Sequence, residues 1–218
     1  MNITIVGCGA LGSLLAARLL EGGARVQLLQ RAGAQLEALR AGGLVIEGDR
    51  DGGRHEWTAA AVSDKAADLE PAGLALVLVK STETANLQFL PDLLSPDGLV
   101  LSLQNGLGNA EALAAIVGAD RVLAGCATYG AYRIAPGVTG WGGDGEIAFG
   151  PWQAATQAAG QECAAAMAAA GLSVRYLDDP RPALWRKLLL NLMINPVSAL
   201  TGLRNGALRE HPEARALM

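Results

Sequence analysis

The chain has 218 residues, of which 51% are hydrophobic and 17% charged, so it can bury the core of one large domain and part of another. Its formal net charge of −4 argues against a nucleic-acid-binding protein, because such proteins usually carry a basic face. Residues 1–17 are apolar but contain glycines, follow no basic segment and end at Arg18. This predicts neither a membrane span nor a targeting segment, and we expect a cytoplasmic protein with no membrane partner.

The three cysteines, Cys8, Cys126 and Cys163, are odd in number, and no two are close in sequence. This fits reduced cytosolic thiols better than a disulfide framework or a zinc site, so no metal site is predicted. Cys8 lies in a glycine-rich turn. It could be sensitive to oxidation there, although a small filler residue is the default interpretation.

The N-terminus reads as an apolar strand (residues 1–6), a glycine-rich turn and an apolar helix (residues 14–20) without a gap. The turn consists of Gly7, Cys8, Gly9, Ala10, Leu11 and Gly12. Its glycines have the G-x-G-x-x-G spacing of a dinucleotide site, in the strand–turn–helix context that the pattern requires. The first allows the turn, the second lets backbone approach a pyrophosphate, and the third permits close helix–strand packing. The alternative is an ordinary glycine-rich turn.

The second predicted strand, residues 25–30, indicates which dinucleotide binds. NAD sites usually carry an acidic residue about 20 residues after the glycines, where it binds the ribose 2′-hydroxyl. Here the strand ends in Gln30 and Arg31, with no carboxylate. A guanidinium can bind a 2′-phosphate through paired hydrogen bonds, so Arg31 favours NADPH/NADP+. The alternative is that Arg31 is a solvated loop residue.

Strands and helices alternate along the next part of the chain. The predicted strands are residues 44–47, 56–62, 74–79, 99–103, 122–128, 138–141, 146–149 and 172–177. The predicted helices are residues 35–41, 84–89 and 154–170. We expect strands 138–141 and 146–149 to pair antiparallel around the glycine-rich segment between them. The alternation favours an α/β fold with a doubly wound sheet.

Ligands of such sheets bind beyond the carboxyl ends of the strands. Lys80 and Asn105 follow two of the apolar strands, which makes both of them site candidates, and Thr128 is a weaker candidate at a third strand end. A solvated lysine is nearly as good an interpretation of Lys80. The segment 178–182, Asp-Asp-Pro-Arg-Pro, is typical of a domain boundary.

A polar stripe marks the apolar helix predicted after this boundary. Lys187, Asn191 and Asn195 are spaced four residues apart, so they line one narrow face. The rest of the run is rich in leucine and predicts a helix buried on most of its circumference, where such polar groups need partners or a ligand. Alternatively, the asparagines bond to backbone and Lys187 reaches water. We expect Pro196 to kink or end the helix, and Asn205 and Gly206 to form a turn.

These motifs resemble those of the ketopantoate reductase (2-dehydropantoate 2-reductase) family. The matches are the glycine-rich turn, Arg31, Lys80, residues 105–108 and residues 185–196, and the last is much more specific than the first. The resemblance implies NADPH-dependent reduction of 2-dehydropantoate to (R)-pantoate on the way to pantothenate and coenzyme A. It also implies a Rossmann domain, here residues 1–179, followed by the beginning of an all-helical domain, residues 180–218.

The resemblance implies a role for each candidate residue. Hydride delivery to a 2-oxo acid places negative charge on the carbonyl oxygen, which an ammonium can stabilise and protonate; Lys187 matches the family's catalytic lysine. Asn191 and Asn195 would bind the substrate, and Asn105 the cofactor's ribose or the substrate. The glycine turn, Arg31 and Lys80 would hold the cofactor.

The chain departs from the family at its end, where no residue matches a serine that binds the substrate carboxylate or a glutamate that helps to order the site. Apolar residues such as Leu188, Leu192 and Leu208 would then be exposed. A shortened gene, an incomplete sequence and completion by a second chain, as in a homodimer, all fit. The alternative functions are reduction of another 2-oxo acid and a non-catalytic NADP-binding module, which would not need the Lys187 stripe. A dehydrogenase of a sugar acid or polyol phosphate is disfavoured, because the substrate helix has no basic cluster beyond Arg186 and Lys187.

Overall fold

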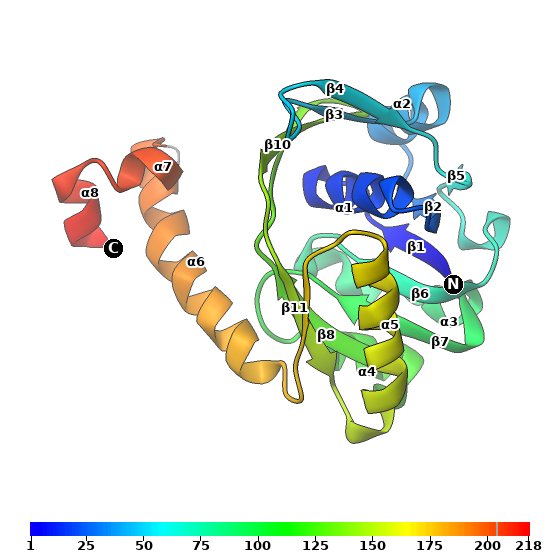
Figure 1. Cartoon of the computed structure of the whole chain (residues 1–218). Coiled ribbons are helices and arrows are strands. Elements are labelled where there is room, and N and C mark those ends of the chain that lie inside the picture. The colour runs from blue at the N-terminus through cyan, green and yellow to red at the C-terminus, as the bar shows by residue number, and fades with distance from the viewer. Residues whose placement is uncertain (204) are drawn as a thin grey trace.

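The structure is a computed structural model that describes residues 1–203 and 205–218. Its main element is an eight-stranded sheet of order β12-β11-β8-β7-β6-β1-β2-β5 (Figure 1). The strands are β1 Asn2–Val6, β2 Arg25–Leu29, β5 Ala61–Ser63, β6 Ala72–Val77, β7 Leu94–Ser102, β8 Val122–Ala127, β11 Ile147–Pro151 and β12 Val174–Tyr176. The six strands from β5 to β8 are parallel, and β11 runs antiparallel to β8. Their order is that of a Rossmann sheet, which confirms the predicted fold class.

A second sheet of four strands has the order β4-β3-β10-β9. Its strands are β3 Leu44–Glu47, β4 Arg54–Trp57, β9 Gly130–Ala135 and β10 Val138–Gly143. The predicted antiparallel pairing of residues 138–141 with 146–149 is therefore wrong, because β10 pairs with β3 and β9 whereas β11 pairs with β8 and β12. The predicted strand 56–62 is likewise divided, since β4 belongs to the small sheet and β5 to the large one.

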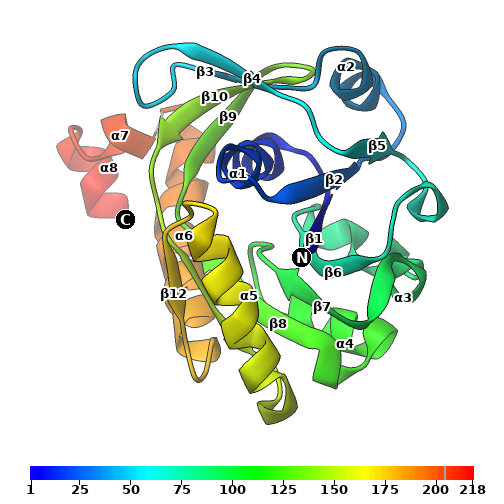
Figure 2. The same ribbon diagram turned by 45° about the vertical axis from the view of Figure 1, so that its right-hand side comes forward.

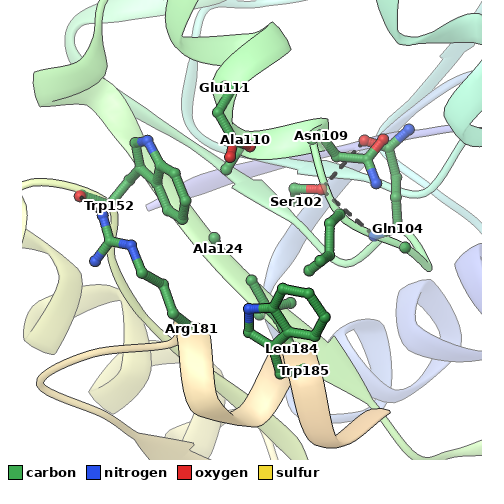
Figure 3. A pocket seen from close by; sticks show the side chains of 14 residues that line it. Ser102, Gln104, Asn109, Ala110, Glu111, Ala124, Trp152, Arg181, Leu184 and Trp185 are labelled. Carbon is green, nitrogen blue, oxygen red and sulfur yellow. Dashed lines mark hydrogen bonds between the residues drawn. The ribbon is translucent and has the colours of Figure 1, made fainter. Parts of the chain in front are cut away.

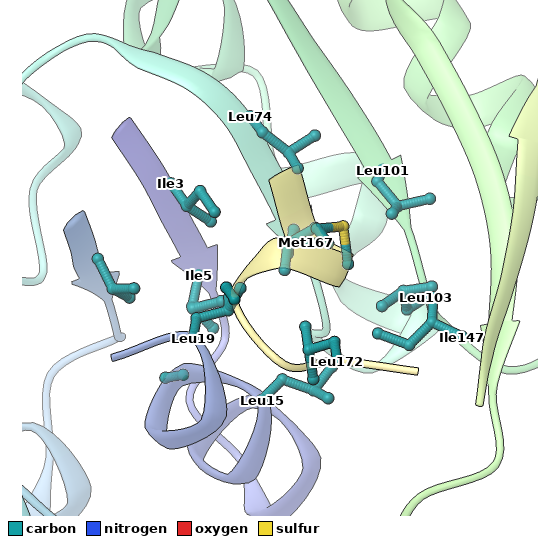
Figure 4. Close-up of a cluster of buried hydrophobic side chains, with 14 of the residues drawn as sticks. Ile3, Ile5, Leu15, Leu19, Leu74, Leu101, Leu103, Ile147, Met167 and Leu172 are labelled. Atoms are coloured by element: carbon teal, nitrogen blue, oxygen red, sulfur yellow. The ribbon is translucent and has the colours of Figure 1, made fainter. Parts of the chain in front are cut away.

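Helices cover both faces of the large sheet (Figure 2). They are α1 Ala10–Glu21, α2 Ala34–Gly42, α3 Leu90–Leu93, α4 Asn109–Val117 and α5 Gln157–Ala169. Helix α1 lies between the two sheets and contacts all four strands of the small one. Successive strand residues supply opposite faces: Ile3 and Ile5 of β1 join the core under α1 and α5 (Figure 4), whereas Val6 joins the core under α3 and α4.

The segment after β6 differs from the helix predicted over residues 84–89. Residues Ser81–Asn86 form a 3-10 helix, and α3 begins only at Leu90. The side chain of Thr84 is buried and hydrogen-bonded to Asn109 on α4. This tertiary contact fixes a tighter turn than the local sequence pattern indicates.

The C-terminal region contains α6 Arg181–Thr201, α7 Asn205–Leu208 and α8 Pro212–Leu217. Helix α6 continues through Pro196, so it does not end at the proline. Only Val197 on α6 is fully buried, which contradicts the prediction of a helix buried on most of its circumference. Of the three leucines expected to be exposed, Leu192 is exposed and Leu188 is half-buried, whereas Leu208 is buried against Val197. The predicted turn at Asn205 and Gly206 is instead the first part of α7.

Within residues 1–203 and 205–218, no helix is both long and apolar enough to cross a lipid bilayer.

Candidate functional site

The glycine-rich turn follows β1 at the point where the strand order of the large sheet reverses, between β2 and β6. Gly7 has a φ of +98°, and a Cβ there would lie 2.7 Å from the backbone nitrogen of Val79. A Cβ on Gly12 would overlap the carbonyl oxygen of Gly7. Both positions therefore require glycine, the first for its backbone conformation and the second for close helix packing.

The same turn leaves room for a dinucleotide. A Cβ built on Gly9 would meet no atom within 4 Å, and α1 begins without a side-chain cap at its N-terminus. The amides of its first turn therefore remain available to an anionic group. This geometry fits the pyrophosphate of a nicotinamide dinucleotide.

Cys8 is held inside the turn by hydrogen bonds of its backbone, and its side chain is buried. Its N–H donates to Oε1 of Gln30 at 2.9 Å, and its carbonyl accepts hydrogen bonds from Ser13 and Gln35. Burial raises the pKa of the Cys8 thiol to about 12, so the thiolate that oxidants attack is disfavoured. Cys8 is thus a buried neutral filler. Gln30 is the residue that sequence reasoning passed over here, although it occupies the strand end at which NAD proteins carry an acid.

Arg31 and Lys80 lie at the ends of the strands that flank β1. Arg31 follows β2 and Lys80 follows β6, and both side chains are exposed. Among the described residues, neither forms an ion pair or a side-chain hydrogen bond. Both cations are therefore free to bind phosphate, and their assigned roles remain predictions.

Two of the asparagines predicted from sequence meet across elements. Nδ2 of Asn191 on α6 donates to Oδ1 of Asn105, in the loop after β7, at 3.5 Å. Lys187, one turn earlier on α6, is half-buried. Asn195, one turn later, is exposed and contacts none of the other candidates through a hydrogen bond among the described residues. Of the stripe on α6, Asn191 therefore contacts the loop at the edge of the sheet, whereas Asn195 does not.

Lys187 also lies near the end of β8. Burial raises the pKa of the Cys126 thiol, and the charge of Lys187 opposes that rise. The Lys187 ammonium therefore interacts electrostatically with Cys126 on β8, the strand that α6 contacts. Thr128, the weaker candidate at this edge, instead pairs with the backbone of Glu146.

A cavity of about 230 Å³ (Figure 3) adjoins residues 106–108, which follow Asn105. It is lined by the N-terminus of α4, by Trp152 and by the first turns of α6, including Arg181 and Trp185. The guanidinium of Arg181 stacks over the Trp152 ring at 4.2 Å, which attaches the start of α6 to the α/β unit. Sequence reasoning did not predict this cavity, because its walls come from segments far apart in the chain.

Comparison with known proteins identifies the family. Residues 3–154 match the family model described as ketopantoate reductase PanE/ApbA, and residues 179–218 match the model of its C-terminal part. The chain belongs to the ketopantoate reductase family. This confirms the resemblance seen in the sequence motifs.

Individual ketopantoate reductases support this assignment. The 2-dehydropantoate 2-reductase of Halobacterium salinarum is 36% identical over 219 aligned residues, covering 100% of this chain and 71% of the relative. The enzyme of the same name from Pyrococcus horikoshii is 33% identical, covering 97% of this chain and 67% of the relative. The crystal structure of 2-dehydropantoate 2-reductase from Geobacter metallireducens superimposes with a TM-score of 0.88 at 31% identity, covering 99% of this chain and 71% of that one.

Membership of the family makes the chain an oxidoreductase of the 2-dehydropantoate 2-reductase type. It also indicates a nicotinamide cofactor and a small-molecule substrate. The open glycine turn and the free cations beside it fit such a cofactor.

Proposed function

We propose that this chain binds NADPH and reduces 2-dehydropantoate to (R)-pantoate, the product needed for pantothenate and coenzyme A synthesis. The observation that carries the proposal is the contact between Asn191 and Asn105. It joins the polar stripe of α6 to the carboxyl edge of the parallel sheet, where ligands of such folds bind. A module that only bound a nucleotide would have no need of this stripe.

In this proposal the residues of the α/β unit, 1–179, hold the cofactor, which supplies the hydride when bound. The turn formed by Gly7, Cys8, Gly9, Ala10, Leu11 and Gly12 holds its pyrophosphate through the amides at the start of α1, since those of Gly7 and Cys8 are paired within the protein. The exposed guanidinium of Arg31 binds the 2′-phosphate, since no carboxylate stands at the end of β2 to repel it. Lys80 adds a second cation at the neighbouring strand end.

The residues of 180–218 then act on the substrate. Lys187 stabilises the negative charge that develops on the carbonyl oxygen and donates the proton that completes the alcohol. Asn191 and Asn195 bind the hydroxyl and carbonyl groups of the acid, one and two turns along α6. Asn105, which lies where the α/β unit meets α6, orients the cofactor's ribose or the substrate.

The test compares the wild-type chain with Lys187→Ala, following the loss of reduced nicotinamide absorbance with 2-dehydropantoate. We expect kcat to fall by about 10²- to 10⁴-fold, as for loss of a general acid, with the Kd for NADPH within about twofold. Arg186→Ala is the matched control, because it removes an adjacent but exposed cation of the same helix. A mild loss of kcat would remove Lys187 as the acid.

The wild-type result separates the alternatives. Turnover of other 2-oxo acids but not of 2-dehydropantoate would keep the reductase and change its substrate. NADPH binding without turnover of any 2-oxo acid would favour the non-catalytic module.

A further inference from the structure

The loop that carries Asn105 has little to hold it in place by itself. Gly106 and Gly108 follow Asn105 with φ angles of +92° and +87°, and Leu107 between them is exposed. Glycines at such angles leave the backbone a wide choice of conformations in the absence of other contacts. The position of the Asn105 side chain therefore depends on contacts with residues outside this glycine-rich segment.

Four buried polar side chains lie behind the loop and hydrogen-bond to one another. They are Thr84, Ser102, Gln104 and Asn109, each no more than 7% exposed. They come from the 3-10 helix after β6, from the end of β7 and from the start of α4. Buried polar groups are costly unless they are paired, so each side chain restricts the orientation of its neighbour.

Gln104 anchors this network to the neighbouring strand end. Its Nε2 donates to the carbonyl oxygen of Val79 at 3.1 Å and to Oγ1 of Thr84 at 2.8 Å. Its Oε1 accepts a hydrogen bond from Ser102 at 3.1 Å. One amide therefore ties the end of β7 to the backbone that follows β6.

The hydroxyl of Thr84 fixes the direction of the next bonds. Because Oγ1 accepts from Gln104, its proton is directed at Oδ1 of Asn109, 3.2 Å away. The amide of Asn109 must then point its Nδ2 outward, where it donates to the backbone carbonyl of Asn105 at 3.2 Å. The far side of Asn105 meets Asn191. A continuous chain of hydrogen bonds thus runs from Val79 to α6.

We propose that Thr84, Gln104 and Asn109 are positioning residues that hold Asn105 in the geometry needed to bind cofactor and substrate. The proposal rests on the proposed function, in which Asn105 contacts one or both ligands. In this proposal the three side chains act together through the bond from Asn109 to the Asn105 backbone, and their role does not require contact with a ligand, although Gln104 and Asn109 also line the cavity beside the loop.

The first test substitutes the residue at the centre of the network. Thr84→Val keeps the shape of the side chain but removes the hydroxyl, which leaves Oδ1 of Asn109 without its donor and frees that amide to turn. Thr84→Ser keeps the hydroxyl. Two affinities are measured by titration: that for NADPH, and that of the NADP+-loaded chain for 2-dehydropantoate. We expect Thr84→Val to weaken at least one of them about tenfold and Thr84→Ser to stay within about twofold to threefold of wild type.

A matched control separates positioning from general destabilisation. Thr156 is another buried threonine, 1% exposed, whose hydroxyl donates to the carbonyl of Gln153. It belongs to a 3-10 helix before α5 and not to the site. Thr156→Val should lower the midpoint of thermal unfolding and leave both affinities unchanged.

A double-mutant cycle provides the decisive readout. If Thr84 acts through Asn105, then Thr84→Val should change the affected affinity by less than about twofold when Asn105 is already alanine. An undiminished tenfold loss in the Asn105→Ala background would overturn the proposal, because the effect would then be general. Equal affinities of Thr84→Val and Thr84→Ser would overturn it as well.

Failure of the proposed function gives a different result. A wild-type chain that does not bind NADPH would contradict the cofactor assignment, and the positioning role with it, before any variant is measured. A wild-type chain that binds NADPH but turns over no 2-oxo acid would contradict only the reductase, because the affinities still report on the network.

Discussion

Arg31 stands where a single side chain decides between two cofactors. It follows β2, it is exposed, and no carboxylate lies beside it in the sequence. We expect Arg31→Ala to raise the Kd for NADPH by about 10- to 100-fold, the effect of losing charge-assisted hydrogen bonds to a phosphate. The Kd for NADH should stay within about threefold, since NADH lacks the 2′-phosphate. Titration of both cofactors measures this difference.

Arg25→Ala is the control for that measurement, because Arg25 lies at the opposite end of the same strand and pairs with Glu70. Equal weakening of NADPH and NADH by Arg31→Ala would show that the guanidinium does not read the 2′-phosphate. A solvated loop residue, the alternative that the sequence left open, would affect neither cofactor.

Individual site residues were predictable where local rules apply. The glycine spacing and the strand before it indicate a turn whose first and third glycines, Gly7 and Gly12, cannot carry a Cβ. Residues at strand ends were predictable because parallel strands end at one edge. The network behind Asn105 was not, because its bonds from Thr84 to Asn109 and from Gln104 to Val79 and Thr84 join residues that lie 20 to 25 positions apart, and no sequence period marks such pairs.

At the scale of elements, strand positions were predicted better than strand partners. Residues 138–141 were correctly predicted as a strand, which is part of β10. Its parallel pairing with β3, which lies far earlier in the chain, was not predicted. The local pattern of polar and apolar residues does not indicate which distant strand pairs with β10. The end of α6 was also not predictable from local sequence. Pro196 lacks the N–H that would donate to the carbonyl of Leu192, which usually disrupts a helix. The helix nevertheless continues to Thr201, and the Leu192 side chain is 60% exposed.

An ion pair connects α1 to the small sheet, and its loss should be measurable. Arg18 on α1 is 3% exposed and forms two hydrogen bonds to Asp49, which is 6% exposed in the β3–β4 loop. We expect Asp49→Asn to lower the free energy of unfolding by at most about 3–5 kcal/mol near neutral pH, because it leaves the buried guanidinium with Glu21, a half-exposed carboxylate, as its remaining charged partner. Urea unfolding of both chains gives the difference.

The pH dependence of that difference has a definite sign. The hydrogen bond from Arg18 holds the pKa of the Asp49 carboxyl below its usual value. The stabilisation is therefore fully present above the unfolded pKa of about 4 and is lost as pH falls through the lower folded value. Glu70→Gln, in an exposed pair with Arg25, should cost less than about 1 kcal/mol. A difference between wild type and Asp49→Asn that persists undiminished at acid pH would contradict this account.

At the scale of the whole molecule, the family matches reach both ends of the chain, whereas burial is uneven along it. The large hydrophobic clusters lie on the two faces of the eight-stranded sheet. The C-terminal cluster is small, and its buried members among the residues that the structure describes are Val197, Leu208 and Ala214. The leucine-rich pattern of α6 predicts a helix buried on most of its circumference, but the pattern does not indicate which residues would pack against it. In the structure Leu189, Leu190 and Leu192 remain exposed.

This uneven burial predicts where stability resides. Leu76 on β6 is fully buried, whereas Leu192 on α6 is 60% exposed. We expect Leu76→Ala to lower the free energy of unfolding by about 2–5 kcal/mol, through lost burial and the cavity left behind. Leu192→Ala, the same chemical change at a solvated position, should stay within about 0.5 kcal/mol. Urea denaturation at two protein concentrations measures both values. A large cost for Leu192→Ala that grows with protein concentration would contradict the prediction, because it would mean that a second copy covers this face of α6 in solution.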